Sequence, residues 1–436
     1  MPSGKKLSAN ASVAGRLFFP QSRALGIAPD DTASPGVLRK MIYAGTNASS
    51  FQQASQDLKH EAELEISAQR IMRATKRIGQ ERVAEREAAV EAWEALSIPE
   101  ERQRPPHVAP PAVACVEMDG GRIQIRDRRP SAKEEREEER RKGRFWRETK
   151  VGCLWSATSE VSPSDPCPQI PEVFVNPGKM REIAGEIKGF AGEAGAADAA
   201  KSADRKERRT REGRPQPLAR EVLATRENVE SFGKQLAAAA WALGFAAAPR
   251  KAFLGDGSET NWSVWRKYFS HYTPILDFVH ALCYVYAAAM AGRSFAEGWP
   301  IYVQWAQWIW SGQTALVIAA LQERLAALGP PGENEAEDSP RQRVADTLRY
   351  LQNQQSRMRY HEYRRQGLPI TSCHIESTIK QINRRVKGSE KFWSEGGAEA
   401  LLQLAADYLS ESSPLTPYWS RRQAAATGQR HYQTAM

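Results

Sequence analysis

The chain has 436 residues, with 61 Lys and Arg against 52 Asp and Glu, and a formal net charge of +9. A chain of this length is too long for one compact core, which predicts two or three domains. The positive charge favours a polyanionic partner. Five widely spaced cysteines without a Cys-x-x-Cys pair argue against a zinc ribbon or a disulfide framework and fit a reducing cytoplasm. No apolar run follows the first residues, and glutamines interrupt the apolar stretch 299–321, so we expect neither a signal peptide nor a membrane span.

The N-terminal part of the sequence predicts an arm followed by helices. Residues 1–35 are rich in Ser, Ala, Pro and Gly and are interpreted as a flexible arm. Within 36–105, apolar residues recur at helical spacing from Phe51 to Leu58, and Ser67 is a candidate N-cap of a second helix that ends at Gly79. Two helices with a tight turn are typical of a DNA-binding helix-turn-helix, and a helical hairpin that only packs fits the pattern equally well.

After a proline-rich linker the pattern changes to strands. Segments 114–118 and 122–128 alternate around Asp119-Gly120-Gly121, which predicts a hairpin with its turn at the glycines. A third strand is expected at 150–157, and a short strand at 251–254 ends at Gly255-Asp256-Gly257. Between them we expect helices at 179–190 and 218–243, separated by a loose basic connector at 191–216. A last strand is expected at 274–278.

These elements divide the rest of the chain into four parts. Residues 106–281 form the first part of an α/β core, and 282–366 form a helical insertion with a loop at 329–340. Residues 367–410 complete the core with a helix at 372–386, and 411–436 are interpreted as a loosely ordered tail. The predicted fold class is therefore a mixed sheet flanked by helices, with a helical N-terminal region and an all-helical insertion.

Three acidic residues have settings that suit metal chemistry. Asp119 and Asp256 each end a predicted strand and precede glycine, which leaves room for an ion and a phosphate. Glu376 lies on a predicted helix, and Lys380, Arg384 and Lys387 follow on roughly the same face. Carboxylates are the hard ligands that Mg²⁺ prefers, and two such ions can activate a nucleophile and stabilise a leaving oxygen in phosphoryl transfer.

Several segments resemble bacterial insertion-sequence transposases of the ISKra family, which belong to the broad Asp-Asp-Glu class. The resemblance covers about residues 36–410, and its most specific block is GLPITSCHIES at 367–377. The other matching segments are VEMDGGRIQIR (116–126), WRETKVG (146–152), LGDGSETNW (254–262), ILDFVHA (275–281), RRVKG (384–388) and FWS (392–394). The resemblance implies a ribonuclease-H-like core in which Asp119, Asp256 and Glu376 hold two Mg²⁺ or Mn²⁺ ions.

The resemblance also implies partners and a location. We expect cleavage of transposon-end DNA followed by strand transfer, double-stranded terminal-repeat and target DNA as partners, a dimer or higher oligomer, and a cytoplasmic, nucleoid-associated protein. Six cations are candidate DNA contacts: Arg359, Arg364, Arg365, Lys380, Arg384 and Lys387. Asp277 is an accessory metal-ligand candidate and His280 a candidate contact of the scissile phosphate, although capping of the next helix is the stronger expectation for both.

Two other functions fit the same sequence. A transposase relic would keep the DNA-binding surfaces while its metal site decays, but all three acids are present. A metal-dependent nuclease would cut DNA without joining it.

Overall fold

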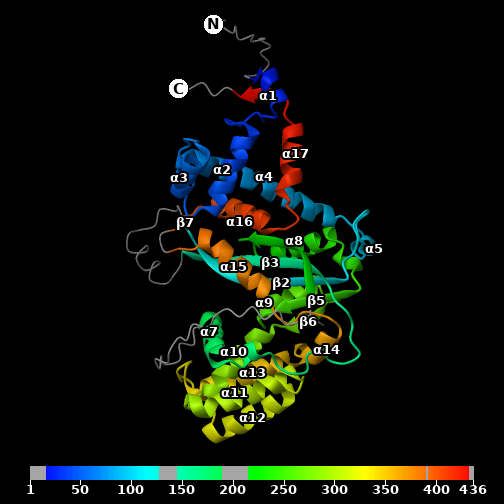
Figure 1. The fold of residues 1–436 in the computed structure, drawn as a ribbon, viewed down its shortest axis with the longest axis vertical. Coiled ribbons are helices and arrows are strands. Elements are labelled where there is room, and N and C mark those ends of the chain that lie inside the picture. Colours follow the sequence, from blue (N-terminus) through cyan, green and yellow to red (C-terminus); the bar gives the residue numbers. More distant parts are fainter. Residues whose placement is uncertain (1–15, 127–144, 189–214, 389–390, 432–436) are drawn as a thin grey trace.

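The computed structural model describes residues 16–126, 145–188, 215–388 and 391–431. Figure 1 shows three tiers: the N-terminal helices with α16 and α17 at one end, a sheet in the middle, and the helices α10–α13 at the other end. The central tier positions the candidate site, and the two helical tiers each contact it.

The sheet is mixed, as expected. Its strand order is β4-β3-β2-β5-β6, and β7 pairs with the far end of β2. The pairs β2–β3 and β3–β4 are antiparallel, whereas β2–β5, β5–β6 and β2–β7 are parallel. The strands are β2 (Val113–Ile125), β3 (Trp146–Thr158), β4 (Gln216–Thr225), β5 (Arg250–Gly255), β6 (Thr273–Leu276) and β7 (Phe392–Trp393).

Helices cover both faces of this sheet. Helix α8 (Val229–Ala242) packs where β3 has Gly152, since a Cβ there would lie 2.5 Å from Leu236 Cδ2. Helix α15 (Cys373–Val386) packs on the opposite face, because Trp155 on β3 points the other way from Gly152 and its ring lies against that of His374, with centroids 4.7 Å apart. Helix α9 (Glu259–Tyr268) follows β5.

The segment expected as a helical insertion consists of helices and loops. It contains α10 (Phe278–Met290), α11 (Phe295–Trp310), α12 (Thr314–Leu328), α13 (Pro340–Gln354), η3 (Gln355–Arg357) and α14 (Tyr360–Arg365). Helix α7 (Pro177–Lys188) packs against α10. Two further 3₁₀ turns are η1 (Glu172–Phe174) and η2 (Phe245–Ala247).

The N-terminal helices form a second hydrophobic core together with the C-terminal end of the described chain. Leu38, Ile42 and Ile71 are buried there against Leu415 and Trp419. The elements are β1 (Arg16–Phe18), α1 (Pro20–Ala24), α2 (Pro35–Asn47), α3 (Phe51–Ala62), α4 (Ala68–Glu94), α5 (Ile98–Glu101), α16 (Glu395–Leu409), α17 (Leu415–Ala424) and β8 (Gln429–His431).

This arrangement corrects the expectation of a flexible arm and a loose tail. Strands β1 and β8 pair with each other, and the buried Asp31 binds Arg77 on α4 and Arg422 on α17. The two ends are therefore held by strand pairing with each other and by ion pairs. The sequence of either segment alone does not reveal these contacts, because the partner residues lie elsewhere in the chain. Residues 1–15 and 432–436 lie outside the described chain.

The second N-terminal helix is longer than predicted. Ser67 caps α4 by accepting the backbone N–H of Arg70, as expected, but the helix continues through Gly79 to Glu94. Gly79 does not end the helix: it lets α16 approach, since a Cβ there would lie 2.4 Å from the Ala400 carbonyl oxygen. Helix α4 is therefore a packing element along most of its length.

Two predictions of secondary structure in the core were wrong. The predicted hairpin at Asp119-Gly120-Gly121 is instead one continuous strand, in which Gly120 pairs with Lys150 and Gly121 with Thr149. The first part of the predicted helix 218–243 is strand β4, because its partner β3 supplies the pairing that outweighs the helix-forming composition. The expected connector 191–216 lies mostly outside the described residues.

Candidate metal site at the strand ends

The register of the parallel strands places three aspartates in one row. In the β2–β5 ladder the last pair is Glu117 with Leu254, so Asp119 and Asp256 both follow two residues later. In the β5–β6 ladder Gly255 pairs with Leu276, so Asp277 follows at the level of Asp256. Strands β5 and β6 end at this edge of the sheet and β2 continues past it, so carboxylates from three neighbouring parallel strands lie side by side here.

Asp256 is oriented by the turn that follows it. Its Oδ1 accepts the Ser258 backbone N–H at 2.8 Å and the Asn261 Nδ2 at 2.9 Å. Asn261 Nδ2 also donates to the Met118 carbonyl oxygen at 3.2 Å, next to Asp119. The Asn261 amide therefore links the two strands that carry the two aspartates.

Asp277 is fully buried and has the expected capping role. It is the N-cap of α10, where its Oδ2 accepts the His280 backbone N–H at 2.8 Å and lies 2.7 Å from His280 Nδ1. Its Oδ1 accepts the Ser372 backbone N–H at 2.7 Å. Asp277 thus joins the end of β6 to the beginning of α15 and orients the His280 ring.

Glu376 lies in the first turn of α15 and faces this group. Ligand atoms of Glu376, Asp277 and His280 lie within 4.8 Å of one another. Burial raises the pKa of Glu376, and the charges of Asp277 and Asp119 raise it further, against the opposing effect of His280 and Lys380. Glu376 and Asp119 are therefore close enough to interact electrostatically.

The pKa of Asp119 shows the same crowding of negative charge. Burial raises this pKa, and the charges of Asp256 and Asp277 add to the shift, while the Gly120 N–H, 2.6 Å from Asp119 Oδ1, opposes it. Burial lowers the pKa of His280, but its bond to Asp277 and the neighbouring acids outweigh burial and raise it. A divalent cation among these groups would remove the repulsion between the carboxylates, so the donor set fits Mg²⁺ or Mn²⁺.

The close group in the structure is therefore Asp277, His280 and Glu376, of which only Glu376 belongs to the predicted triad. Asp119 and Asp256 lie beside this group, because the strand register places Asp256 at the level of both Asp119 and Asp277. Nearby, the side chains of Lys380 and Arg384 on α15 and of Lys387 directly after it are exposed, as are Arg359 and Arg365 around α14. These five cations lie on the surface, as contact with DNA would require.

Arg364 departs from the predicted set of DNA contacts. Its side chain is buried, and its guanidinium binds the Asp165 carboxylate through Nε at 2.9 Å and through Nη2. Nη2 also donates to the Trp310 carbonyl oxygen at 2.9 Å, and the guanidinium lies 3.9 Å from the Trp310 ring centroid. These contacts commit Arg364 to the packing between α11, α14 and the loop at Asp165.

Sequence reasoning missed two buried, hydrogen-bonded charged residues on elements that carry candidate ligands. Glu117, two residues before Asp119, is buried and bonded to α15. Arg385 on α15 is buried between the rings of Phe51 and Trp393 and donates to the Gly45 carbonyl oxygen at 3.0 Å from Nη2. Charged side chains in a sequence usually indicate surface, so no local signal identifies them as buried.

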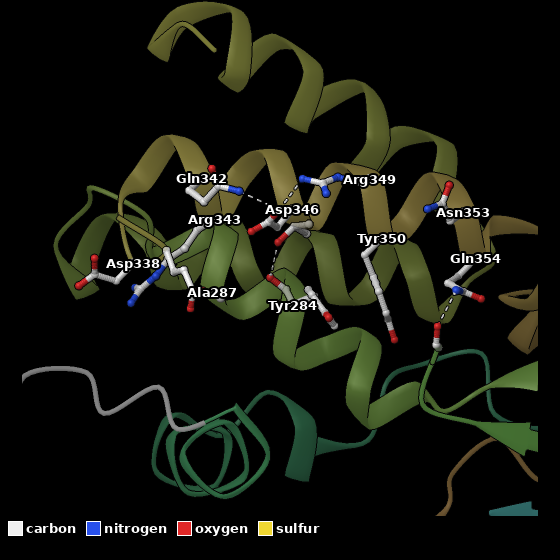
Figure 2. A pocket seen from close by; sticks show the side chains of 13 residues that line it. Tyr284, Ala287, Asp338, Gln342, Arg343, Asp346, Arg349, Tyr350, Asn353 and Gln354 are labelled. Atoms are coloured by element: carbon white, nitrogen blue, oxygen red, sulfur yellow. Dashed lines mark hydrogen bonds and ion pairs between the residues drawn. The ribbon is translucent and has the colours of Figure 1, made fainter. Parts of the chain in front are cut away.

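A hollow of about 720 Å³ runs beside the turn that carries Asp256, along α13. Figure 2 shows Tyr284 and Tyr350 side by side in its lining; their rings are stacked with centroids 3.7 Å apart. Tyr350 Oη donates to the Asp256 carbonyl oxygen at 2.7 Å, and Gln354 Nε2 donates to the Gly257 carbonyl oxygen at 3.1 Å. The helical tier therefore contacts the candidate metal site directly at the Asp256 turn.

Comparison with family models and with curated protein sequences finds no match to this chain. Within the described part of the chain, none of the helices has both the length and the apolar character that crossing a membrane requires.

Proposed function

We propose that this chain is a DNA transposase of the Asp-Asp-Glu class with a ribonuclease-H-like core. The observation that carries the proposal is that Asp119 and Asp256 lie at the same level of neighbouring parallel strands, beside the close group of Asp277, His280 and Glu376. The sheet is compatible with this proposal, since three antiparallel strands followed by two parallel strands beside the first are the order expected of a ribonuclease-H-like core.

The chain's own residues would divide the work of holding two Mg²⁺ or Mn²⁺ ions. Asp119 would ligate from the rigid central strand, Asp256 from a turn fixed by Asn261, and Glu376 from the first turn of α15. When two such metal ions are bound, one activates water or a 3′-hydroxyl as nucleophile and the other stabilises the leaving oxygen. Asp277 orients His280 at the edge of this group and so shapes the space for the scissile phosphate.

The exposed cations would bind the DNA backbone. Lys380 and Arg384 continue along α15 from Glu376, and Lys387 follows its last residue. Each phosphate that they neutralise would release counterions and strengthen binding at low salt. Arg359 and Arg365 would extend the contact around α14. The partners proposed are double-stranded terminal repeats and target DNA, and pairing of two ends requires a dimer or higher oligomer in a cytoplasmic, nucleoid-associated complex.

The test is cleavage of a labelled duplex carrying the terminal repeat of the element, with Mg²⁺ or Mn²⁺. We expect the wild type to cut and Glu376→Gln to bind the duplex without cutting. Glu323→Gln on α12 is the matched control, since Glu323 is exposed and belongs to another helix. Binding without cutting in every variant would favour the relic. Cutting without joining of the freed 3′ end to a target duplex would favour the nuclease.

A further inference from the structure

Glu117 on the central strand is a carboxyl group with no access to solvent. Its exposed fraction is 0%, and it lies on the same face of β2 as Asp119. Burying a carboxyl group is costly unless hydrogen bonds compensate it. Glu117 has such bonds: Oε1 accepts the Trp155 indole N–H at 2.8 Å, and Oε2 accepts the Ile375 backbone N–H at 3.1 Å.

The second of these bonds lies at the N-terminus of the helix that carries Glu376. The first backbone N–H groups of a helix lack partners within the helix and are usually bonded by an N-cap side chain. Ser372, the N-cap of α15, makes no such side-chain bond. The Ile375 N–H is shared between Glu117 and the Ser372 carbonyl oxygen at 3.2 Å, and the Ser372 N–H is bonded by Asp277. Helix α15 is therefore capped by side-chain carboxyl groups from distant parts of the chain.

We propose that Glu117 is a positioning residue that sets the height and rotation of α15 and thereby places the Glu376 carboxylate opposite Asp119. The inference rests on the proposed function only in taking Glu376 as a metal ligand. Glu376 follows Ile375 directly, so a change at the Ile375 N–H moves the ligand itself. Both oxygens of Glu117 already accept N–H groups, which argues for a role behind the ligands and not as one of them.

Glutamine at this position tests the contact because it keeps the volume but has a single acceptor oxygen. In Glu117→Gln the side-chain NH₂ must face either the Trp155 indole N–H or the Ile375 N–H, and both are donors. Trp155→Phe removes the indole donor, so in the double variant the remaining carbonyl oxygen can serve Ile375 alone. Asp407→Asn on α16 is the control. Asp407 is also a buried carboxyl group, but its hydrogen bonds come from Arg82 of α4 and Gln403 of α16.

The first measurement is the affinity for Mn²⁺ without DNA, detected through the EPR signal of the unbound ion. We expect Glu117→Gln to weaken binding about 10- to 100-fold, as loss of a group that orients a ligand commonly does. The double variant should recover part of this loss, and Asp407→Asn should bind Mn²⁺ as the wild type does even if its thermal stability falls. Wild-type affinity in Glu117→Gln, or an equal loss in Asp407→Asn, would overturn the proposal.

The second measurement is amide hydrogen exchange in the segment 372–380 without metal. Faster exchange in Glu117→Gln but not in Asp407→Asn is the expected result, and unchanged exchange would overturn the proposed anchoring. This readout separates the two ideas: a wild type that binds no Mn²⁺ would remove the metal site of the proposed function, while the exchange data still decide whether Glu117 holds α15.

Discussion

Two adjacent arginines, Arg364 and Arg365, provide a matched test of which cations hold the fold and which bind DNA. The guanidinium of Arg364 is buried against Asp165 and Trp310, whereas the Arg365 side chain is exposed at the end of α14. We predict that Arg364→Gln destabilises the protein and leaves the salt dependence of DNA binding unchanged. Arg365→Gln should leave stability unchanged and weaken DNA binding.

The expected magnitudes follow from the contacts. Removing one partner of a buried ion pair costs about 3–5 kcal/mol, because the other charge is left without compensation. Asp165 is partly exposed and water can solvate it after the change, so we expect about 2–3 kcal/mol for Arg364→Gln. Loss of one phosphate contact at Arg365 should reduce the slope of log affinity against log salt by about 1.

The assays are thermal or urea unfolding for stability, and fluorescence anisotropy of a labelled duplex at several salt concentrations for binding. Both variants are measured in both assays, so each acts as the control of the other. The reasoning is refuted if Arg364→Gln keeps wild-type stability. It is also refuted if Arg364→Gln lowers the salt slope as much as Arg365→Gln does.

Three further predictions concern groups that join the tiers. Arg385→Met should lower the free energy of unfolding by about 2 kcal/mol in urea titrations, because the Gly45 carbonyl oxygen near the end of α2 loses a buried charged donor; wild-type stability would contradict this. Tyr350→Phe removes the bond to the Asp256 carbonyl oxygen and should weaken Mn²⁺ binding measured by titration, with a stability loss of about 1 kcal/mol; unchanged affinity would show that the turn holds without it. Burial raises the pKa of Asp165, but the Arg364 guanidinium outweighs it and holds this pKa below the ordinary 3.8, so the ion pair stabilises the fold above that pH and the contribution is lost as the pH falls through the lowered value. The melting temperature should therefore fall more steeply with decreasing pH below pH 4 in the wild type than in Arg364→Gln. An equal pH dependence of the two melting temperatures would count against this linkage.

The candidate ligands could be predicted because each has a local signature. Asp256 and Asp277 each follow a short apolar strand, and glycine flanks Asp119 and Asp256, so the pattern of polar residues at strand ends is visible in the sequence. The helix of Glu376 shows its apolar and basic faces at helical spacing. The grouping of these residues at one edge then follows from the parallel pairing of their strands.

The errors have a common physical source in long-range pairing. Asp119-Gly120-Gly121 has the composition of a tight turn, but β3 pairs with β2 through all three residues and keeps the strand extended. Segment 216–225 contains good helix formers, yet it forms a strand because β3 offers a free edge. In both places the deciding partner is a strand that the local sequence does not contain.

The contacts around the site explain why its three acids depend on different parts of the molecule. Asp119 lies on the central strand, so its position depends on the sheet. The turn of Asp256 is bonded by Tyr350 and Gln354 of α13, so it depends on the helical insertion. Glu376 lies on α15, which Arg385 ties to the N-terminal helices. A chain cut after α4 would also expose the face of α16 that packs on α4. The N-terminal helices are thus part of the scaffold of the candidate site, and their removal should disturb Glu376 as well as any DNA contact that they make.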